Sequence, residues 1–137
     1  MHKRFLYFLL IFYTSLFFCQ SVKGFHIPDS LRNKSFDELD NKFNQFRESN
    51  QSILYVNSYI VKAKKEKNII KLINGYYLQT IKEKEKTGYI DSIKSIIKKS
   101  IDVKELSLGH RKIGNIYYNC GKYDLALSSY LIALSCR

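Results

Sequence analysis

Three carboxylates stand close together near residue 40, and paired carboxylates can carry general acid–base chemistry. Asp37, Glu38 and Asp40 follow directly on Ser35 and Phe36. The Ser-x-x-Glu spacing is that of a capping box, in which two side chains bind the free backbone N–H groups of a helix start. Acidic residues in a first turn also interact favourably with the helix dipole. We therefore interpret the cluster as the start of a helix at Phe36 and not as a catalytic pair.

Other catalytic patterns are missing from the sequence. It has no Gly-rich phosphate loop, no GxSxG motif and no His and Cys residues at metal-ligand spacing. His26 and His110 lie far apart, and we interpret His110 as a packing or surface residue on a helix. The sequence therefore predicts no catalytic residues, no metal site, no cofactor and no enzymatic activity.

Cys120 and Cys136 raise the question of a disulfide, which an oxidising compartment would allow. The pattern around them predicts two antiparallel helices, with Cys120 at the turn and Cys136 at the far end of the second helix. About 12 helical residues would separate them by about 18 Å. A disulfide needs α-carbons within about 7 Å. We therefore expect no bond between them.

The clearest local pattern is this helical hairpin, which runs from residue 107 to 137. Gly114 allows a close helix approach, and Gly121 can adopt the left-handed conformation that ends a helix. The second helix is expected to turn Ala126, Tyr130, Ala133 and Leu134 inward. The residues that define the hairpin are Gly114, Tyr117, Gly121, Ala126, Tyr130 and Ala133.

The hairpin resembles the 34-residue tetratricopeptide repeat. Counted from Ser107, the usual small and aromatic positions fall on Gly114, Tyr117, Ala126, Tyr130 and Ala133. His110 stands where that family often has Trp, and the usual terminal Pro is missing. An ordinary helical hairpin within a bundle is the alternative interpretation.

Apolar residues at spacings of three and four predict further helices before this hairpin. They are expected from Phe36 to about Arg47, from near Gln51 to the lysines at 62–67, from Asn68 to about Lys86, and from after Gly88 to Lys99. Thr87 and Gly88 are expected to end the third of these, and Asp102 to cap the hairpin's first helix. Gly75 precedes a Tyr pair as Gly114 does. The expected fold is all-α: a short tetratricopeptide-like α-solenoid over 36–137, after a linker at 20–35.

The N-terminus has the form of a secretory signal, with basic residues before an apolar run from Phe5 to Cys19. We expect a leader over 1–19, with cleavage before Gln20 or, alternatively, after Gly24. An uncleaved signal anchor is the competing interpretation. Either one predicts a location in the periplasm or on the extracytoplasmic side of a membrane.

The chain is strongly basic, with 23 Lys and Arg against 12 Asp and Glu and a formal charge of +11. Such a surplus can attract nucleic acid or anionic lipid. The lysines are, however, scattered along helices and mixed with acidic residues. A basic helical protein that binds nucleic acid or an anionic membrane surface is therefore the alternative function.

Several short segments behind the leader resemble a family of Bacteroidetes regulators: Ile27-Pro28-Asp29-Ser30-Leu31, Ser35-Phe36-Asp37-Glu38-Leu39, Ala63-Lys64-Lys65-Glu66-Lys67 and Gly75-Tyr76-Tyr77-Leu78. That family joins an exported tetratricopeptide sensor to a membrane helix and a cytoplasmic AraC-type helix-turn-helix domain. The resemblance implies that this chain corresponds to the sensor's beginning, as an N-terminal fragment of a larger, truncated regulator. It implies no DNA binding by this chain.

The expected function is therefore non-catalytic binding of a protein or peptide. Aromatic residues combined with polar groups suit such contacts. Asn115 and Tyr118 are the predicted partner-binding residues, on the side of their helix away from the Gly114 contact. Packing against a neighbouring helix is the alternative role for both.

Overall fold

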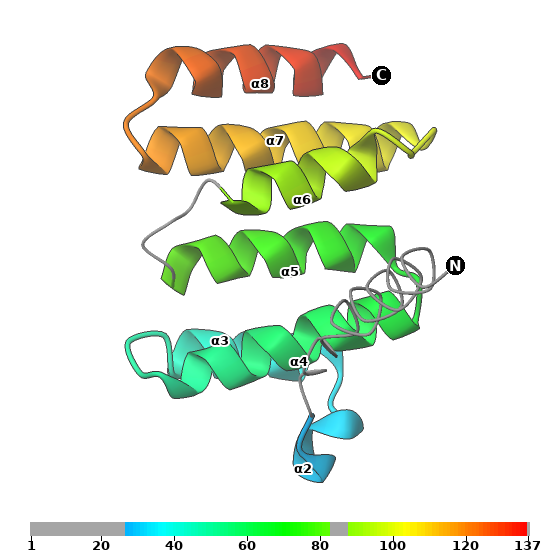
Figure 1. Cartoon of the computed structure of the whole chain (residues 1–137), viewed down its shortest axis with the longest axis vertical. Coiled ribbons are helices and arrows are strands. Elements are labelled where there is room, and N and C mark those ends of the chain that lie inside the picture. Colours follow the sequence, from blue (N-terminus) through cyan, green and yellow to red (C-terminus); the bar gives the residue numbers. More distant parts are fainter. Residues whose placement is uncertain (1–26, 83–87, 137) are drawn as a thin grey trace, which may run out of the picture.

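Local backbone signals divide the chain into short helices separated by tight turns. A computed structural model describes residues 27–82 and 88–136, and within them the regular structure is helical, without strands (Figure 1). The helices are α2 (Asp29–Arg32), α3 (Phe36–Gln45), α4 (Gln51–Lys65), α5 (Ile69–Lys82), α6 (Gly88–Ile97), α7 (Val103–Asn119) and α8 (Tyr123–Ser135). The expected all-α class is confirmed. The expected leader at 1–19, or up to 24, lies outside the described residues.

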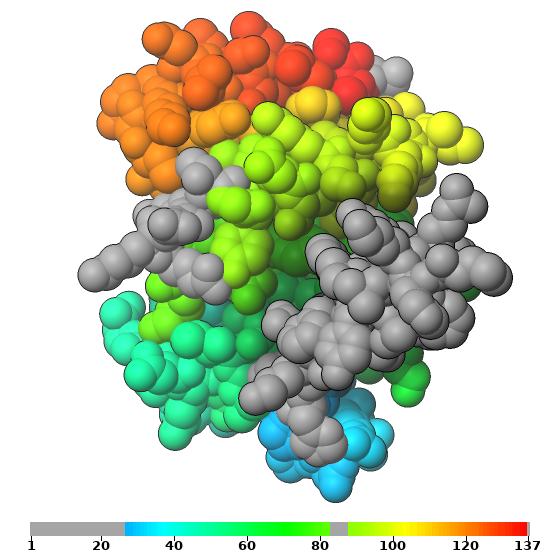
Figure 2. All heavy atoms as spheres, in the orientation of Figure 1, coloured from blue at the N-terminus to red at the C-terminus, as the bar shows by residue number. Residues whose placement is uncertain are grey.

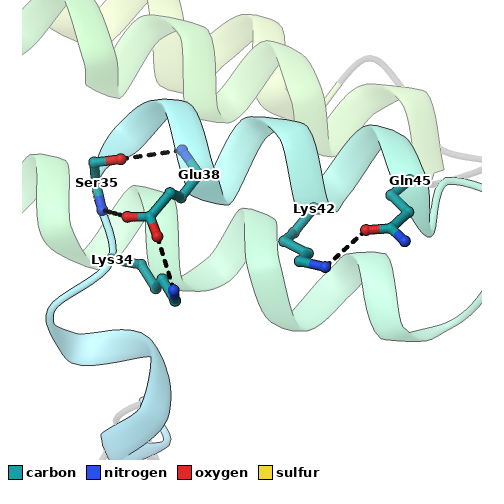
Figure 3. A network of polar contacts seen from close by, with 5 residues as sticks. All are labelled: Lys34, Ser35, Glu38, Lys42 and Gln45. Carbon is teal, nitrogen blue, oxygen red and sulfur yellow. Dashed lines mark hydrogen bonds and ion pairs between the residues drawn. The ribbon is translucent and has the colours of Figure 1, made fainter.

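Helix α3 begins with the predicted capping box (Figure 3). The Ser35 hydroxyl accepts the Glu38 backbone N–H at 3.1 Å, and the Glu38 carboxylate accepts the Ser35 backbone N–H at 2.8 Å. The Lys34 ammonium reaches the other carboxylate oxygen at 2.7 Å. The Glu38 carboxylate therefore caps the start of α3, as the sequence predicted.

The capping box predicts a pH dependence of stability. The hydrogen bond from Lys34, followed by those from the Ser35 backbone and hydroxyl, lowers the pKa of Glu38 from 4.5 to about 2. The stabilisation that depends on the ionised carboxylate should be complete above pH 4.5 and lost as the pH falls towards about 2. We expect Glu38→Gln to lower the melting temperature at neutral pH, with the difference shrinking over that range. Melting curves at several pH values measure this. A difference that does not change with pH would contradict it.

Both ends of α7 follow their predicted signals. The Asp102 carboxylate caps α7 by accepting the backbone N–H groups of Lys104 and Glu105 at 2.7 and 3.3 Å. At the other end Gly121 has a φ of 72°. The Lys122 N–H donates to the Tyr117 carbonyl at 2.9 Å, the bond that marks a Schellman cap. Gly121 thus ends α7 as predicted.

The core consists of two apolar clusters joined by α5. One cluster packs α5, α6 and α7 together through Ile73, Ile90, Ile93, Ile97, Ile113 and Ile116. The other centres on Phe43, Val56 and Ile60 of α3 and α4, with Leu72, Tyr76, Leu78 and Ile81 of α5 packed against it. Because α5 contacts both clusters, it is the central helix of the described structure.

The helices stack along the long axis of the molecule, with α8 at one end and α2 at the other (Figure 1). Each helix from α3 to α8 packs on the next one in sequence, and α5 also packs directly on α7. Figure 2 shows the side chains of α8 covering one end of the molecule. From α3 to α8, helices that follow one another in sequence are therefore spatial neighbours. Helices α5 and α7 are also in contact, although they are not consecutive.

Glycines mark the closest helix approaches. A Cβ atom built at Gly114 would lie 2.6 Å from Cε1 of the Tyr130 ring on α8, as the predicted close contact requires. One at Gly75 would lie 2.7 Å from Cγ1 of Ile60 on α4, the helix before its own. Gly75 therefore packs against the preceding helix and Gly114 against the following one, although both precede a Tyr pair.

Two sequence predictions about these helices are wrong. Leu134 does not face inward, because its side chain is 61% exposed. The face of α8 that packs on α7 carries Ala126, Ser129 and Ala133, and Leu134 lies about 100° further round the helix. Gly88 does not end a helix but begins α6. A first helical residue has no intrahelical N–H bond to maintain, so glycine is tolerated there.

Candidate binding groove

The two predicted partner-binding residues lie near the C-terminal end of α7. Tyr118 is 59% exposed, and its ring meets that of Tyr123 edge-on at 5.5 Å between centroids. Asn115 is half-buried, and its side-chain oxygen accepts the Tyr130 hydroxyl at 2.8 Å. Asn115 therefore helps to hold α7 and α8 together, whereas Tyr118 offers an accessible ring. Neither residue lines the groove described below.

A hollow of about 230 Å³ is lined mainly by α3, α5 and α7. These are the first helices of the three successive helix pairs α3–α4, α5–α6 and α7–α8. We call this hollow the A-groove. Its lining residues are Phe36, Asp37, Asp40, Tyr59, Lys71, Asn74, Tyr77, Leu78 and Lys112.

The A-groove has walls of opposite charge. Asp37 and Asp40 stand one helical turn apart on α3, whereas Lys71 on α5 and Lys112 on α7 supply ammonium groups. The only ion pair between these groups in the described structure joins Lys71 Nζ to Asp37 Oδ1 at 3.8 Å. Asp37 is largely exposed to solvent, so this long contact adds little stability. The charged side chains are thus available to a ligand.

Aromatic rings lie beneath the lysines of the A-groove. Lys112 Nζ lies 4.2 Å from the centroid of the Tyr77 ring, and Lys71 Nζ lies 5.2 Å from that of Phe36. Both distances permit a cation–π interaction, which also limits where each ammonium points. The lysines are therefore held in place by the groove itself.

Lys112 is the most desolvated cation of this site. Burial and then the neighbouring Arg111 lower the pKa of Lys112, while Asp40 opposes the shift. The Asp40 charge is also felt by Tyr59, whose pKa is raised to about 12, mainly by burial and then by Asp40 and Asp37. In the described part of the chain, no carboxylate lies within ion-pair distance of Lys112. Its positive charge is therefore only partly compensated.

A second, larger hollow of about 560 Å³ lies against α7 and α8. Its lining includes Val103, Leu108 and Leu134, and it adjoins Cys136, which like Cys120 is a free, half-buried thiol. Beside it, α8 exposes the row Tyr123, Leu127, Leu131 and Leu134, each more than half exposed. The lining also includes Lys104 and Arg111 but no carboxylate, so it lacks the opposed charges of the A-groove and offers less selectivity.

No protein-family model, no curated protein and no solved structure matches this chain. The geometry of the A-groove is therefore what bears on its function.

Sequence reasoning missed the A-groove because its residues come from three helices separated along the chain. The available signal was a polar stripe opposite each apolar face: Asp37 and Asp40 on α3, and Lys71 and Asn74 on α5, both at spacing three. Lys112 gave no such signal, because charged and apolar residues are mixed around it on α7.

Groups suited to other chemistry are not assembled in residues 27–82 and 88–136. No cluster of three or more His, Cys, Asp and Glu side chains there could hold a metal ion. No helix there combines the length and the apolar character needed to cross a membrane. His110 is half-buried, and burial, followed by Lys94, lowers its pKa. It does not line the A-groove.

Proposed function

We propose that this chain is a non-catalytic interaction module that binds a segment of another protein in the A-groove. The observation that carries the proposal is that the first helices of three successive helix pairs line one charged and aromatic hollow. Ligands bind in concave sites with a few well-placed polar groups among apolar side chains. Phe36, Tyr77 and Leu78 supply apolar contacts, and Asn74 and the charged residues supply polar ones.

The helix pairs of this module form a short tetratricopeptide-like α-solenoid in our proposal. The order of packing supports it, since each helix contacts the next and α5 also contacts α7. The small and aromatic positions of α7 and α8 support it too: Gly114 approaches Tyr130, and Ala126 and Ala133 are buried. An α-solenoid of this kind presents an extended concave surface to its partner.

We place this module on the extracytoplasmic side of a membrane, as the sensor part of a larger signalling regulator. The support is the signal-like leader and the resemblance of short segments to exported regulator sensors. The alternative, a basic protein that binds nucleic acid or an anionic membrane surface, is favoured by the charge of +11 alone. Asp37 and Asp40 in the A-groove weigh against a polyanionic ligand there.

A peptide selection tests the proposed function. The full chain is used to select binders from a displayed library of random 12-residue peptides. We expect binders whose affinity falls at least tenfold in Asn74→Trp, because a bulky ring at this position fills the A-groove. The matched control Ser95→Trp changes an exposed position on α6 and should retain binding.

The result against the proposal is equally specific. Binders that are insensitive to Asn74→Trp, or the absence of any binder, would overturn it. Binding to duplex DNA or anionic vesicles that falls steeply with rising salt, and that does not depend on Asn74, would favour the alternative.

A further inference from the structure

Resting on the proposed function, we infer that the A-groove selects peptides with a single isolated carboxylate, bound by Lys112 and Lys71 between α7 and α5. A peptide or nucleic acid with closely spaced negative charges is excluded by Asp37 and Asp40 on the facing wall. The ligand carboxylate can belong to an Asp or Glu side chain or to a C-terminus, and both present the same chemistry.

Lys112 supplies the first part of the argument. Its ammonium is half-buried and rests on the Tyr77 ring at 4.2 Å, and it has no ion-pair or hydrogen-bond partner in the described structure. A partly desolvated cation gains more from an entering carboxylate than a solvated surface lysine does, because the local dielectric constant is lower. Hydrogen bonds between ionised groups are also the stronger ones. A carboxylate is therefore the group that completes this site.

Lys71 and Asn74 supply the second part. Lys71 makes only a 3.8 Å contact with the exposed Asp37, so this ion pair competes weakly with a ligand carboxylate for its ammonium. Asn74 lies one turn further along α5, and its amide makes no hydrogen bond in the described structure. It can donate an N–H to the same carboxylate. Two cations and one neutral donor from α5 and α7 thus line the A-groove.

Asp37 and Asp40 supply the limit on ligand charge. The Asp40 charge adds to the raised pKa of Tyr59 and opposes the lowering of the Lys112 pKa by burial, so it acts on groups across the A-groove from α3. Near α3 the two carboxylates outnumber the one groove lysine, Lys71, that contacts them, so a second ligand carboxylate there would meet a net negative charge. Neutral or basic residues suit that position instead. The charges therefore also set the orientation of a bound peptide, with its carboxylate at the lysines and its neutral or basic residues near Asp37 and Asp40.

The charge pattern of selected peptides tests this inference. Two displayed 12-residue libraries are used with the full chain, one fused so that its C-terminus is free and one with the C-terminus blocked by the fusion. We expect binders with one acidic group, flanked by neutral or basic residues. Acidic side chains enriched in both libraries identify a side-chain carboxylate, whereas binders from the free-end library alone identify a C-terminal one.

Three variants make the test specific to the A-groove. Lys112→Met should reduce binding at least tenfold and remove the acidic preference, while Lys99→Met, at an exposed position after α6, should change neither. Asp40→Asn should admit peptides with two adjacent acidic residues. Circular dichroism of each variant verifies that it is folded.

Failure of this inference differs from failure of the proposed function. Binders that are lost in Asn74→Trp but show no acidic preference, or that survive Lys112→Met, overturn the inference and leave the proposed function standing. Tighter binding of a 12-residue poly-glutamate than of peptides with one carboxylate also overturns it. Binders that ignore Asn74→Trp, or no binders, overturn both.

Discussion

Replacing Phe43 with alanine lowers the free energy of unfolding by about 3–5 kcal/mol, the usual cost of deleting a fully buried aromatic side chain. The Phe43 side chain is 0% exposed and packs with Val56 and Ile60 between α3 and α4. Single domains unfold with about 5–15 kcal/mol in total, so the loss is a large part of the stability. Urea unfolding followed by circular dichroism measures it, from the shift in midpoint at constant slope.

Leu127→Ala is the matched control for this large-to-small substitution. Leu127 is 59% exposed on α8, so its truncation should change the stability by less than about 0.5 kcal/mol. A Phe43→Ala variant as stable as Leu127→Ala would contradict the packing of α3 against α4. It would also remove the support for Asp37 and Asp40, which the same helix places in the A-groove.

Gly109→Ala should lower the free energy of unfolding by about 1–3 kcal/mol through overpacking. A Cβ atom at Gly109 would lie 2.3 Å from Cγ2 of Ile97, the shortest such distance at any described glycine. This methyl group is attached directly to Cβ of a β-branched side chain, so it cannot swing away as a longer side chain would. Helix α6 must therefore shift against α7. Thermal melting of the purified variant measures the loss.

Gly88→Ala provides the opposite expectation for the same chemical change. A Cβ atom at Gly88 meets nothing within 4 Å, and the residue begins α6. Alanine there should be neutral or stabilising by up to about 1 kcal/mol, because it restricts the unfolded chain. Equal effects of the two substitutions would show that α6 and α7 do not approach as closely as described.

Much of the fold could be predicted because its signals are local. Ser35 and Glu38 lie three residues apart, and Gly121 ends α7 through its own backbone, so neighbouring residues suffice to identify them. Gly114 and Tyr130 also lie within one helix pair. Periodicity was less reliable on α8, which is apolar nearly all round. The pattern therefore could not show that Leu134 points away from α7.

The candidate site could not be predicted in the same way. The A-groove depends on the stacking of α5 between α3 and α7, and this brings Asp40 near Lys112 across more than half of the chain. Asn115 has the residue type of a binding group, yet its oxygen is used by Tyr130. The leader, the partner and the wider regulator remain predictions from the sequence.

The central position of α5 has a consequence for how such a protein can change over time. One face of α5 carries Ile73, which is buried in the core, while Lys71, Asn74 and Tyr77 line the A-groove. Lys71 and Asn74 belong to neither core cluster, so substitutions there alter charge and shape without removing core contacts, whereas Tyr77 also packs against the cluster of α5, α6 and α7. A lineage could therefore acquire a new partner through changes at Lys71 and Asn74 on an unchanged scaffold, while stability constrains Ile73 and Tyr77 of the same helix.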